Sequence, residues 1–306
     1  MINKILIIFV MLSTLAWGAA YRDYNIQTDY GISARSIALG SVEGFSESAT
    51  SIFENPAGLY RVKNYSFSAF KSAIMDYQVF YNSVAFAGNT PFGKVGIGFY
   101  EAASFAIPET GLDTTGVVDK HYIKDTFDYK SSIYKLSYQG NLKPNLYFGT
   151  SFTLYSQRYF DVNGRGSNFD AGLILKRDKY EVSGLIRNLF PNSKVKYTNY
   201  EPENLPTHFV VSLKKPFWQF ETFSQIKKVR LHYLPSLGVK IAPKRMSYIH
   251  FMTGFKEQLD VTYGRNKKWT FGIGLDLFDI HFHYAYERSD YILQDSKNYF
   301  SMHYNF

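Results

Sequence analysis

The feature that most constrains this chain is an alternation of apolar and polar side chains in segments of similar length. In residues 269–277, Trp269 and Phe271 begin an apolar set at odd positions, while Thr270 and Gly272 begin a polar or small set at even positions. A period of two places the two sets on opposite faces of a β-strand. Most such segments span roughly 9–12 residues, about the length that a tilted strand needs to cross a bilayer. The pattern predicts an all-β fold, a transmembrane antiparallel β-barrel.

This alternation predicts fourteen strands. Their expected ranges are 62–72, 77–88, 94–105, 130–141, 144–158, 167–177, 179–189, 206–214, 217–227, 229–242, 246–256, 269–277, 279–288 and 298–306. An even number of strands returns both ends of the barrel to the same side of a membrane. Short turns alternate with longer connections, which we expect to be outer loops. The longer connections are 106–129, 159–166, 190–205, 257–268 and 289–297.

The two ends of the chain carry signals of their own. Lys4, the apolar core 5–15 and the small residues after it have the order of a cleavable export signal, so we exclude residues 1–20 from the fold. The core is too short for a membrane-spanning helix, which needs about 20 apolar residues. The chain has no cysteine, which excludes a lipidated N-terminal cysteine, disulfides and thiolate metal sites.

The last strand places large side chains on one face. Phe300, Met302, Tyr304 and the terminal Phe306 alternate with smaller or polar residues. This ending resembles the assembly signal of bacterial outer-membrane barrels. Together with the export signal, it predicts a location in the bacterial outer membrane.

Residues 21–60 differ from the rest of the chain. They are rich in small residues and include Asn55-Pro56, a turn start, and Ala57-Gly58, which allows a close backbone approach. We expect this segment to plug the barrel lumen. The predicted organisation is a signal peptide at 1–20, a plug at 21–60 and a barrel at 61–306.

Several motifs follow one another in an order that resembles a known family. They are Ala34-Arg35, Ala38-Leu39-Gly40, Asn55-Pro56-Ala57-Gly58-Leu59, Asp170-Ala171-Gly172-Leu173, the stretch 184–189 and the terminal Phe306. The chain resembles the FadL-like superfamily of outer-membrane barrels, most closely its PorV/PorQ proteins associated with type IX secretion. The resemblance implies a fourteen-stranded barrel with an internal N-terminal plug, in which Asn55 to Leu59 form the plug signature.

Two kinds of chemical site need consideration, a metal site and a catalytic site. His281 and His283 share the lumen face with Glu287 and lie beside His303, a pattern that can ligate a metal. We favour polar lumen residues that bond with their neighbours, and expect neither a metal nor a cofactor. No Gly-x-Ser-x-Gly elbow is present, so we expect no catalytic residue and no enzyme activity.

The net charge of +8 also has two interpretations. Nucleic-acid binding fits the charge but conflicts with the export signal. Basic clusters near expected strand ends suit anionic lipid headgroups instead. These clusters are Lys214-Lys215, Lys227-Lys228 with Arg230, Lys240, Lys244-Arg245, and Arg265 with Lys267-Lys268. The aromatics expected at the membrane interfaces are Trp218, Tyr248, Trp269 and Tyr291.

Three functions remain open at this stage. The main prediction is a platform for secreted or envelope proteins, or a secretion accessory, at the cell surface, because loop 106–129 is polar and acidic rather than apolar. The alternatives are a FadL-like channel for uptake or efflux of small hydrophobic molecules and a structural or adhesive barrel. A channel requires contiguous apolar lining, for which the candidates are Tyr147, Tyr155, Ile174 and Leu185. A platform requires exposed aromatics in the outer loops, for which the candidates are Phe190, Tyr197 and Tyr200.

Overall fold

The computed structural model describes residues 23–74, 79–113, 120–246, 248–259, 264–288 and 296–306. The expected signal peptide and Tyr291 lie outside these ranges. Within the described part of the chain, no helix combines the length and apolar character needed to cross a membrane.

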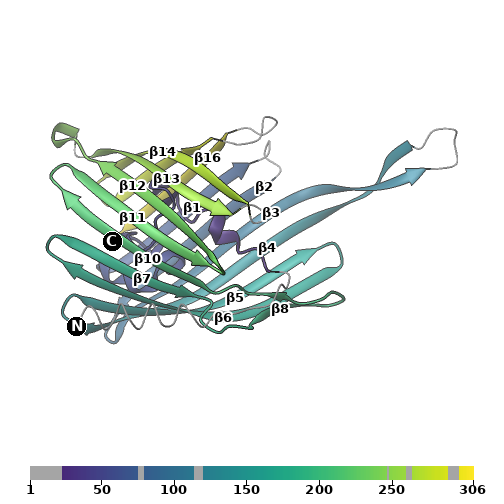
Figure 1. Cartoon of the computed structure of the whole chain (residues 1–306), viewed down its shortest axis with the longest axis horizontal. Helices are drawn as coiled ribbons and strands as arrows, with labels where there is room; N and C mark the ends of the chain where they lie inside the picture. Colours follow the sequence, from purple (N-terminus) through teal and green to yellow (C-terminus); the bar gives the residue numbers. More distant parts are fainter. Residues whose placement is uncertain (1–22, 75–78, 114–119, 247, 260–263, 289–295) are drawn as a thin grey trace.

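The barrel wall is a closed antiparallel sheet (Figure 1). Among the described residues, its fourteen strands are β1 (Tyr65–Ile74), β2 (Val79–Thr90), β3 (Gly93–Asp113), β4 (Lys120–Lys143), β5 (Leu146–Tyr159), β6 (Val162–Arg177), β7 (Tyr180–Arg187), β10 (His208–Phe217), β11 (Phe220–Val229), β12 (His232–Ile241), β13 (Ile249–Leu259), β14 (Arg265–Leu277), β15 (Ile280–Glu287) and β16 (Lys297–Asn305). Each strand pairs with its neighbour in sequence, β7 pairs with β10, and β1 pairs with β16 to close the ring. The predicted fourteen-stranded barrel is confirmed.

The two rims of the barrel differ. At one rim, which we call the turn end, lie six mostly short connections and the C-terminal Phe306; the C-terminus marks this rim in Figure 1. At the opposite rim, the loop end, lie the strand ends that the remaining seven connections join. Several turns place a non-glycine residue at positive φ, including Arg230 at 52° and Trp218 at 58°. Such turns lack the glycine or asparagine that normally marks a hairpin, so their positions are difficult to predict from sequence.

Three of the predicted long loops are wrong in part. Connections 106–129, 159–166 and 257–268 are largely strand, because β3, β4, β6, β13 and β14 extend further than expected. Most conspicuously, β3 and β4 continue as a two-stranded ribbon with Leu112 opposite His121, and Figure 1 shows this hairpin projecting past the rest of the loop end. The ribbon satisfies its backbone hydrogen bonds between its own strands, so it needs no apolar face and resembles a loop by composition.

A short hairpin lies beside the wall at the loop end. Its strands are β8 (Lys194–Tyr197) and β9 (Glu203–Asn204), and β8 pairs with β6 at Gly164 and Arg165. Phe190 and Tyr200 in this connection are exposed, as predicted. Tyr197 is not, because its ring packs against the buried core and its hydroxyl lies 2.6 Å from Gln157 Oε1 and from Glu203 Oε2.

Burial alternates along the strands as the period of two predicts. On β14, Trp269 is 61% exposed while Thr270 is fully buried. Trp218 and Tyr248 are exposed at the turn end. The outward apolar band and the polar, buried inward side chains are the two faces of a barrel wall.

The expected assignment of all basic clusters to headgroups is wrong for four lysines. Lys214, Lys227, Lys240 and Lys268 have largely buried side chains that pair with acids inside the barrel. Their neighbours along a strand point the other way, so a cluster that looks continuous in sequence is divided between the two faces.

The plug comprises short helices that lie within the barrel. They are η1 (Gln27–Tyr30), α2 (Ala34–Ala38), α3 (Ser51–Glu54) and η2 (Pro56–Arg61), and a further turn, η3 (Lys244–Met246), lies at the turn end. Ser33 caps α2 by accepting a hydrogen bond from the backbone N–H of Ser36 at 3.1 Å. Residues 31–59 are almost entirely buried, so the lumen is filled where they lie.

Candidate functional site: the plugged lumen

The plug signature is fixed to the wall by a buried asparagine. Asn55 is fully buried, and its Nδ2 donates to Ser183 Oγ at 2.9 Å and to the carbonyl of Gly184 at 3.0 Å, both on β7. Its Oδ1 accepts from the N–H of Ala57 at 3.0 Å and so caps η2, whose first residue is Pro56. The side chain therefore orders the plug and attaches it to the barrel at the same time.

Two wall glycines make room for this attachment. A Cβ on Gly149 of β5 would lie 2.2 Å from the Ala57 nitrogen, and one on Gly172 of β6 would lie 1.9 Å from Asn55 Oδ1. Both contacts are far inside van der Waals distance, so the backbone of the signature reaches the wall only because these side chains are absent. We call Asn55 to Ala57, with Gly149, Gly172, Ser183 and Gly184, the Asn55 seat.

The seat brings together motifs that are far apart in the sequence. Gly172 belongs to the Asp170–Leu173 motif and Gly184 to the 184–189 stretch. Between them, Asp170 Oδ1 accepts from the N–H of Asn188 at 2.9 Å. Leu59 is also fully buried in the core of the plug. Three of the six motifs that carry the family resemblance thus meet at one contact between plug and wall.

Other inward glycines receive other parts of the plug. A Cβ on Gly254 would lie 2.0 Å from the nitrogen of Gly40, and Gly238 and Gly272 are similarly close to Leu39 and Ala38. Gly96 and Gly98 on β3 face Ile52 and Phe53. The alternating glycines of the strands therefore serve mainly to admit the plug, a role that the sequence alone did not identify.

A cluster of charges forms the second attachment. Arg187 of β7, 1% exposed, pairs with Glu43 at 2.6 Å and with Asp29 at 3.3 Å, both on the plug. Lys227 of β11 pairs with the same two acids at 3.6 and 2.5 Å. Burial would raise the pKa of Asp29, but the charges of Lys227, His208 and Arg187 outweigh it and hold that pKa well below its usual range. We call Asp29, Glu43, Arg187 and Lys227 the ion bridge.

Cavities lie at both ends of the lumen. The loop-end cavity, of about 220 Å³, is bordered by Tyr30 and by Asp29, Glu43 and Lys227 of the ion bridge. The turn-end cavity, of about 920 Å³, is lined largely by charged side chains. Arg61 and Glu181, which form an ion pair, lie at its plug side. Residues of the plug line both cavities.

Aromatic side chains line one side of the lumen beside the plug. Four of these side chains are buried and come from adjacent strands. They are Phe70 of β1, Tyr81 of β2, Tyr100 of β3 and Tyr299 of β16, and we call them the aromatic wall. Tyr100 stands 6.4 Å from Phe70 and 6.5 Å from Tyr81 between ring centres. Its hydroxyl donates to the carbonyl of Gly31 at 2.8 Å, which links the wall to the plug. The alternation along each strand predicts that these four residues face inward. It does not predict that they lie next to one another across the four strands.

The apolar lining expected from the sequence lies elsewhere. Tyr155, Ile174 and Leu185 are buried on β5 to β7, and Tyr147 stacks on Tyr60 of the plug with ring centres 3.8 Å apart. They form part of the plug contact rather than an open path. The aromatic wall is a separate set of inward apolar side chains, on β16 and β1 to β3.

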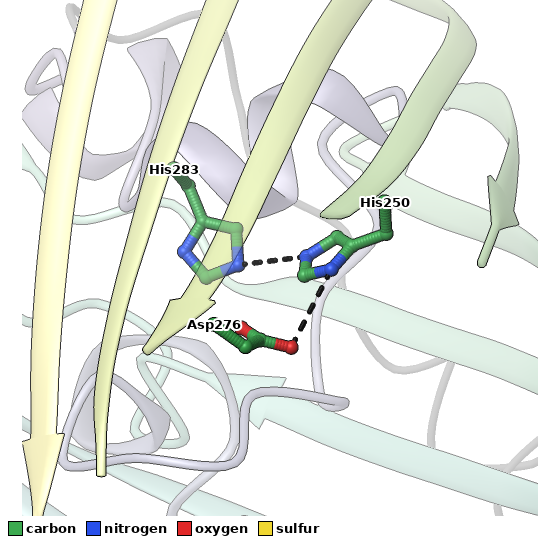
Figure 2. A group of neighbouring side chains, drawn as sticks. All are labelled: His250, Asp276 and His283. Carbon is green, nitrogen blue, oxygen red and sulfur yellow. Dashed lines mark hydrogen bonds and ion pairs between the residues drawn. The ribbon is translucent and has the colours of Figure 1, made fainter. Parts of the chain in front are cut away.

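The histidines singled out in the sequence lie together at the turn end. His281 and His303 stack at 4.3 Å between ring centres, and His303 also stacks on His283 at 5.4 Å. Glu287, the carboxylate of the metal alternative weighed from the sequence, lies further along β15 and pairs with Lys256 and Lys268. Asp276 takes its place, and His250, absent from the expected set, joins the group (Figure 2).

The C-terminal residues lie where the sequence predicts. Phe300, Tyr304 and Phe306 are exposed on the outer face, and Met302 lies between them opposite Ala69 of β1. Phe306 also exchanges backbone hydrogen bonds with Tyr65 at 2.7 and 2.9 Å, so the chain end completes the closure of the barrel.

No protein-family profile and no curated protein sequence matches this chain. Solved structures do. The toluene transporter TodX of Pseudomonas putida aligns with a TM-score of 0.64 at 12% identity, covering 90% of this chain and 99% of that one. The toluene transporter TbuX of Ralstonia pickettii gives 0.60 at 12% identity, over 90% and 98%. A Pseudomonas aeruginosa FadL homologue gives 0.58 at 9% identity, over 94% and 100%. The chain therefore has the fold of FadL-type barrels, while the narrower likeness to PorV/PorQ proteins stays a prediction.

Proposed function

We propose that this chain passes small hydrophobic molecules across the bacterial outer membrane, through a lumen whose plug controls passage. The observation that carries the proposal is the aromatic wall, four buried aromatic side chains on adjacent strands beside the plug. Hydrophobic ligands bind where such lining is buried and continuous. The fold shared with two toluene transporters supports a small aromatic or aliphatic substrate.

Uptake of labelled toluene by cells that carry the protein in their outer membrane tests this proposal. Phe70→Ser should lower uptake about tenfold, because removing one aromatic contact of roughly 1.4 kcal/mol weakens binding by that factor. Phe67→Ser is the matched control, since Phe67 lies on the same strand and faces outward. Equal uptake by both variants and the parent would contradict a path along the aromatic wall.

The proposed location follows from the outward apolar band, the shared fold and the C-terminal strand. Phe300, Met302, Tyr304 and Phe306 are proposed as the assembly signal. Deleting Phe306 should lower the folded fraction in outer-membrane preparations, whereas Asn305→Ser should not. Recovery of the deleted chain, fully folded, in that fraction would remove Phe306 from the signal.

A platform for secreted or envelope proteins is a second candidate, and one feature favours it. The projecting β3–β4 hairpin exposes Leu112, Tyr122 and Ile123 beyond the main wall. Shortening this hairpin should abolish co-purification of partner proteins and leave toluene uptake unchanged. The reverse result would leave the channel as the better account.

A further inference from the structure

The turn end contains a cluster of imidazoles that the proposed passage does not use. Four of the chain's seven histidines gather there, on β13, β15 and β16. They are His250, His281, His283 and His303. Figure 2 shows His250 and His283 facing each other across the lumen side of the wall, with Asp276 beside them.

The spacing of the ring nitrogens is that of ligands on one ion. His250 Nε2 and His283 Nε2 are 3.4 Å apart, long for a hydrogen bond. Two nitrogens bound at 2.0–2.1 Å to a tetrahedral ion lie about 3.3 Å apart. The ligand atom of Asp276 lies within 4.8 Å of both imidazole ligand atoms. We propose that His250, Asp276 and His283 bind one divalent transition-metal ion.

Hydrogen bonding alone does not account for this arrangement. His250 and His283 are 2% and 5% exposed, and the buried Nδ1 of His283 has no hydrogen-bond partner among the described residues. Asp276 Oδ2 lies 3.5 Å from His250 Nδ1, again long for a direct bond. Buried polar atoms are normally paired, so the cluster is incomplete as a purely hydrogen-bonded group.

The surroundings orient the three ligands. His281 Nδ1 lies 2.7 Å from Asp276 Oδ1 and holds the carboxylate in place, as outer-sphere partners of metal ligands do. Gly274 of β14 leaves the space in which the His250 ring lies, since a Cβ there would stand 2.0 Å from His250 Nε2. Lys240 on the adjoining strand β12 is paired with Glu221 at 3.8 Å.

The ligand set selects the class of metal. Two imidazoles and one carboxylate suit Zn²⁺ and its transition-metal neighbours, whereas Mg²⁺ and Ca²⁺ prefer oxygen ligands throughout. Three protein ligands leave a fourth position for water. The turn-end cavity includes in its lining His281, the partner of Asp276.

Calorimetric titration of zinc into the full chain, folded in detergent and treated first with a chelator, tests the proposal. We expect one zinc per chain, and an affinity about 100-fold lower or worse for His250→Ala and for His283→Ala. His121→Ala is the matched control, because His121 is exposed on the projecting part of β4. Unchanged zinc binding by both variants would overturn the site.

Two further measurements separate ligation from general disruption. Gly274→Ala keeps all three ligands and should weaken binding about tenfold by displacing the His250 ring. Cobalt bound to the unaltered chain should show the intense visible absorption of a tetrahedral ion. A weak octahedral spectrum from the unaltered chain would refute the proposal even if every variant failed to fold.

Discussion

At the Asn55 seat the plug meets the wall through uncharged groups, and at the ion bridge it meets the wall through carboxylates and cations. The seat depends on shape: an amide side chain enters a space that Gly149 and Gly172 leave open. The ion bridge depends on charge: two plug acids share Arg187 and Lys227.

The difference suggests a division of labour. A contact that depends on shape is lost when a methyl group is added, because a close-packed interior has no free volume for it. Contacts through charge depend on pH and on the presence of every partner, because a buried charge left alone is costly. We therefore expect the Asn55 seat to be the permanent anchor of the plug and the ion bridge to be the part that can loosen.

The largest effect should come from Arg187→Met. It removes the cation shared by Glu43 and Asp29 and should lower the free energy of unfolding by about 3–5 kcal/mol, the usual cost of breaking a buried pair. Urea unfolding of the detergent-folded barrel, followed by tryptophan fluorescence, measures it. Adding Glu43→Gln should recover part of the loss. A loss below about 1 kcal/mol would mean that the ion bridge is not a stabilising contact.

Gly172→Ala should cost about 3 kcal/mol, because its Cβ would force Asn55 away from its partners on β7. The same unfolding assay applies, and protease cleavage within residues 23–62 should increase. Gly88→Ala is the matched control, since a Cβ there meets only the side chains of Tyr65 and Phe86. Equal losses for the two variants would show that the seat has no special need for glycine.

Asn55→Ala should cost about 2 kcal/mol through the lost cap and the lost bonds to Ser183 and Gly184. Asn55→Asp separates these contributions. It keeps the oxygen that caps η2 but places a carboxylate against the carbonyl of Gly184, so it should destabilise at least as much as alanine. If Asn55→Asp had the stability of the unaltered chain, the cap of η2 would account for the whole contribution of Asn55, and the bonds to Ser183 and Gly184 for none of it.

The sequence predicted the parts of this site that are local. A period of two determines which residues of a strand share a face, and the prediction that His283 faces the lumen agrees with its burial. The five residues from Asn55 to Leu59 were recognised from their own order. Neither inference needs the position of another strand.

What the sequence missed depends on which strands stand beside each other and at what height. Glu287 shares a face with His283, but it lies four residues further along β15, roughly 13 Å at 3.3 Å per residue. Asp276 lies directly opposite His281 on the neighbouring strand. In the same way, Gly172 and Asn55 come into contact only when the plug is folded inside the barrel, so no local sequence pattern predicts the contact.

Acid should loosen the ion bridge before the Asn55 seat. The folded pKa of Asp29 is lowered from its ordinary 3.8, so its stabilisation is complete above that value and is lost as the pH falls through the lowered pKa. The seat itself has no titratable side chain. Hydrogen exchange followed from about pH 4 down to about pH 2 should therefore rise around Asp29 earlier than around Ala57, after correction for intrinsic rates. Simultaneous loss of protection would contradict separate attachments.

The smallest effect should come from Glu54→Gln, beside the seat. Burial raises the pKa of Glu54, and Oε2 accepts from the N–H groups of Gly44 at 2.9 Å and Ser46 at 3.1 Å. A raised carboxyl pKa means that the folded state favours the protonated form, so Glu54 opposes folding increasingly as the pH rises above the ordinary carboxyl pKa of 4.5. Glutamine keeps the acceptor oxygen without the charge and should stabilise the neutral-pH protein by up to about 1 kcal/mol. Glu54→Ala removes the acceptor and should lower the free energy of unfolding. If Glu54→Gln lowered it by the same amount, the charge of Glu54 would be needed to hold the turn from Gly44 to Ser46.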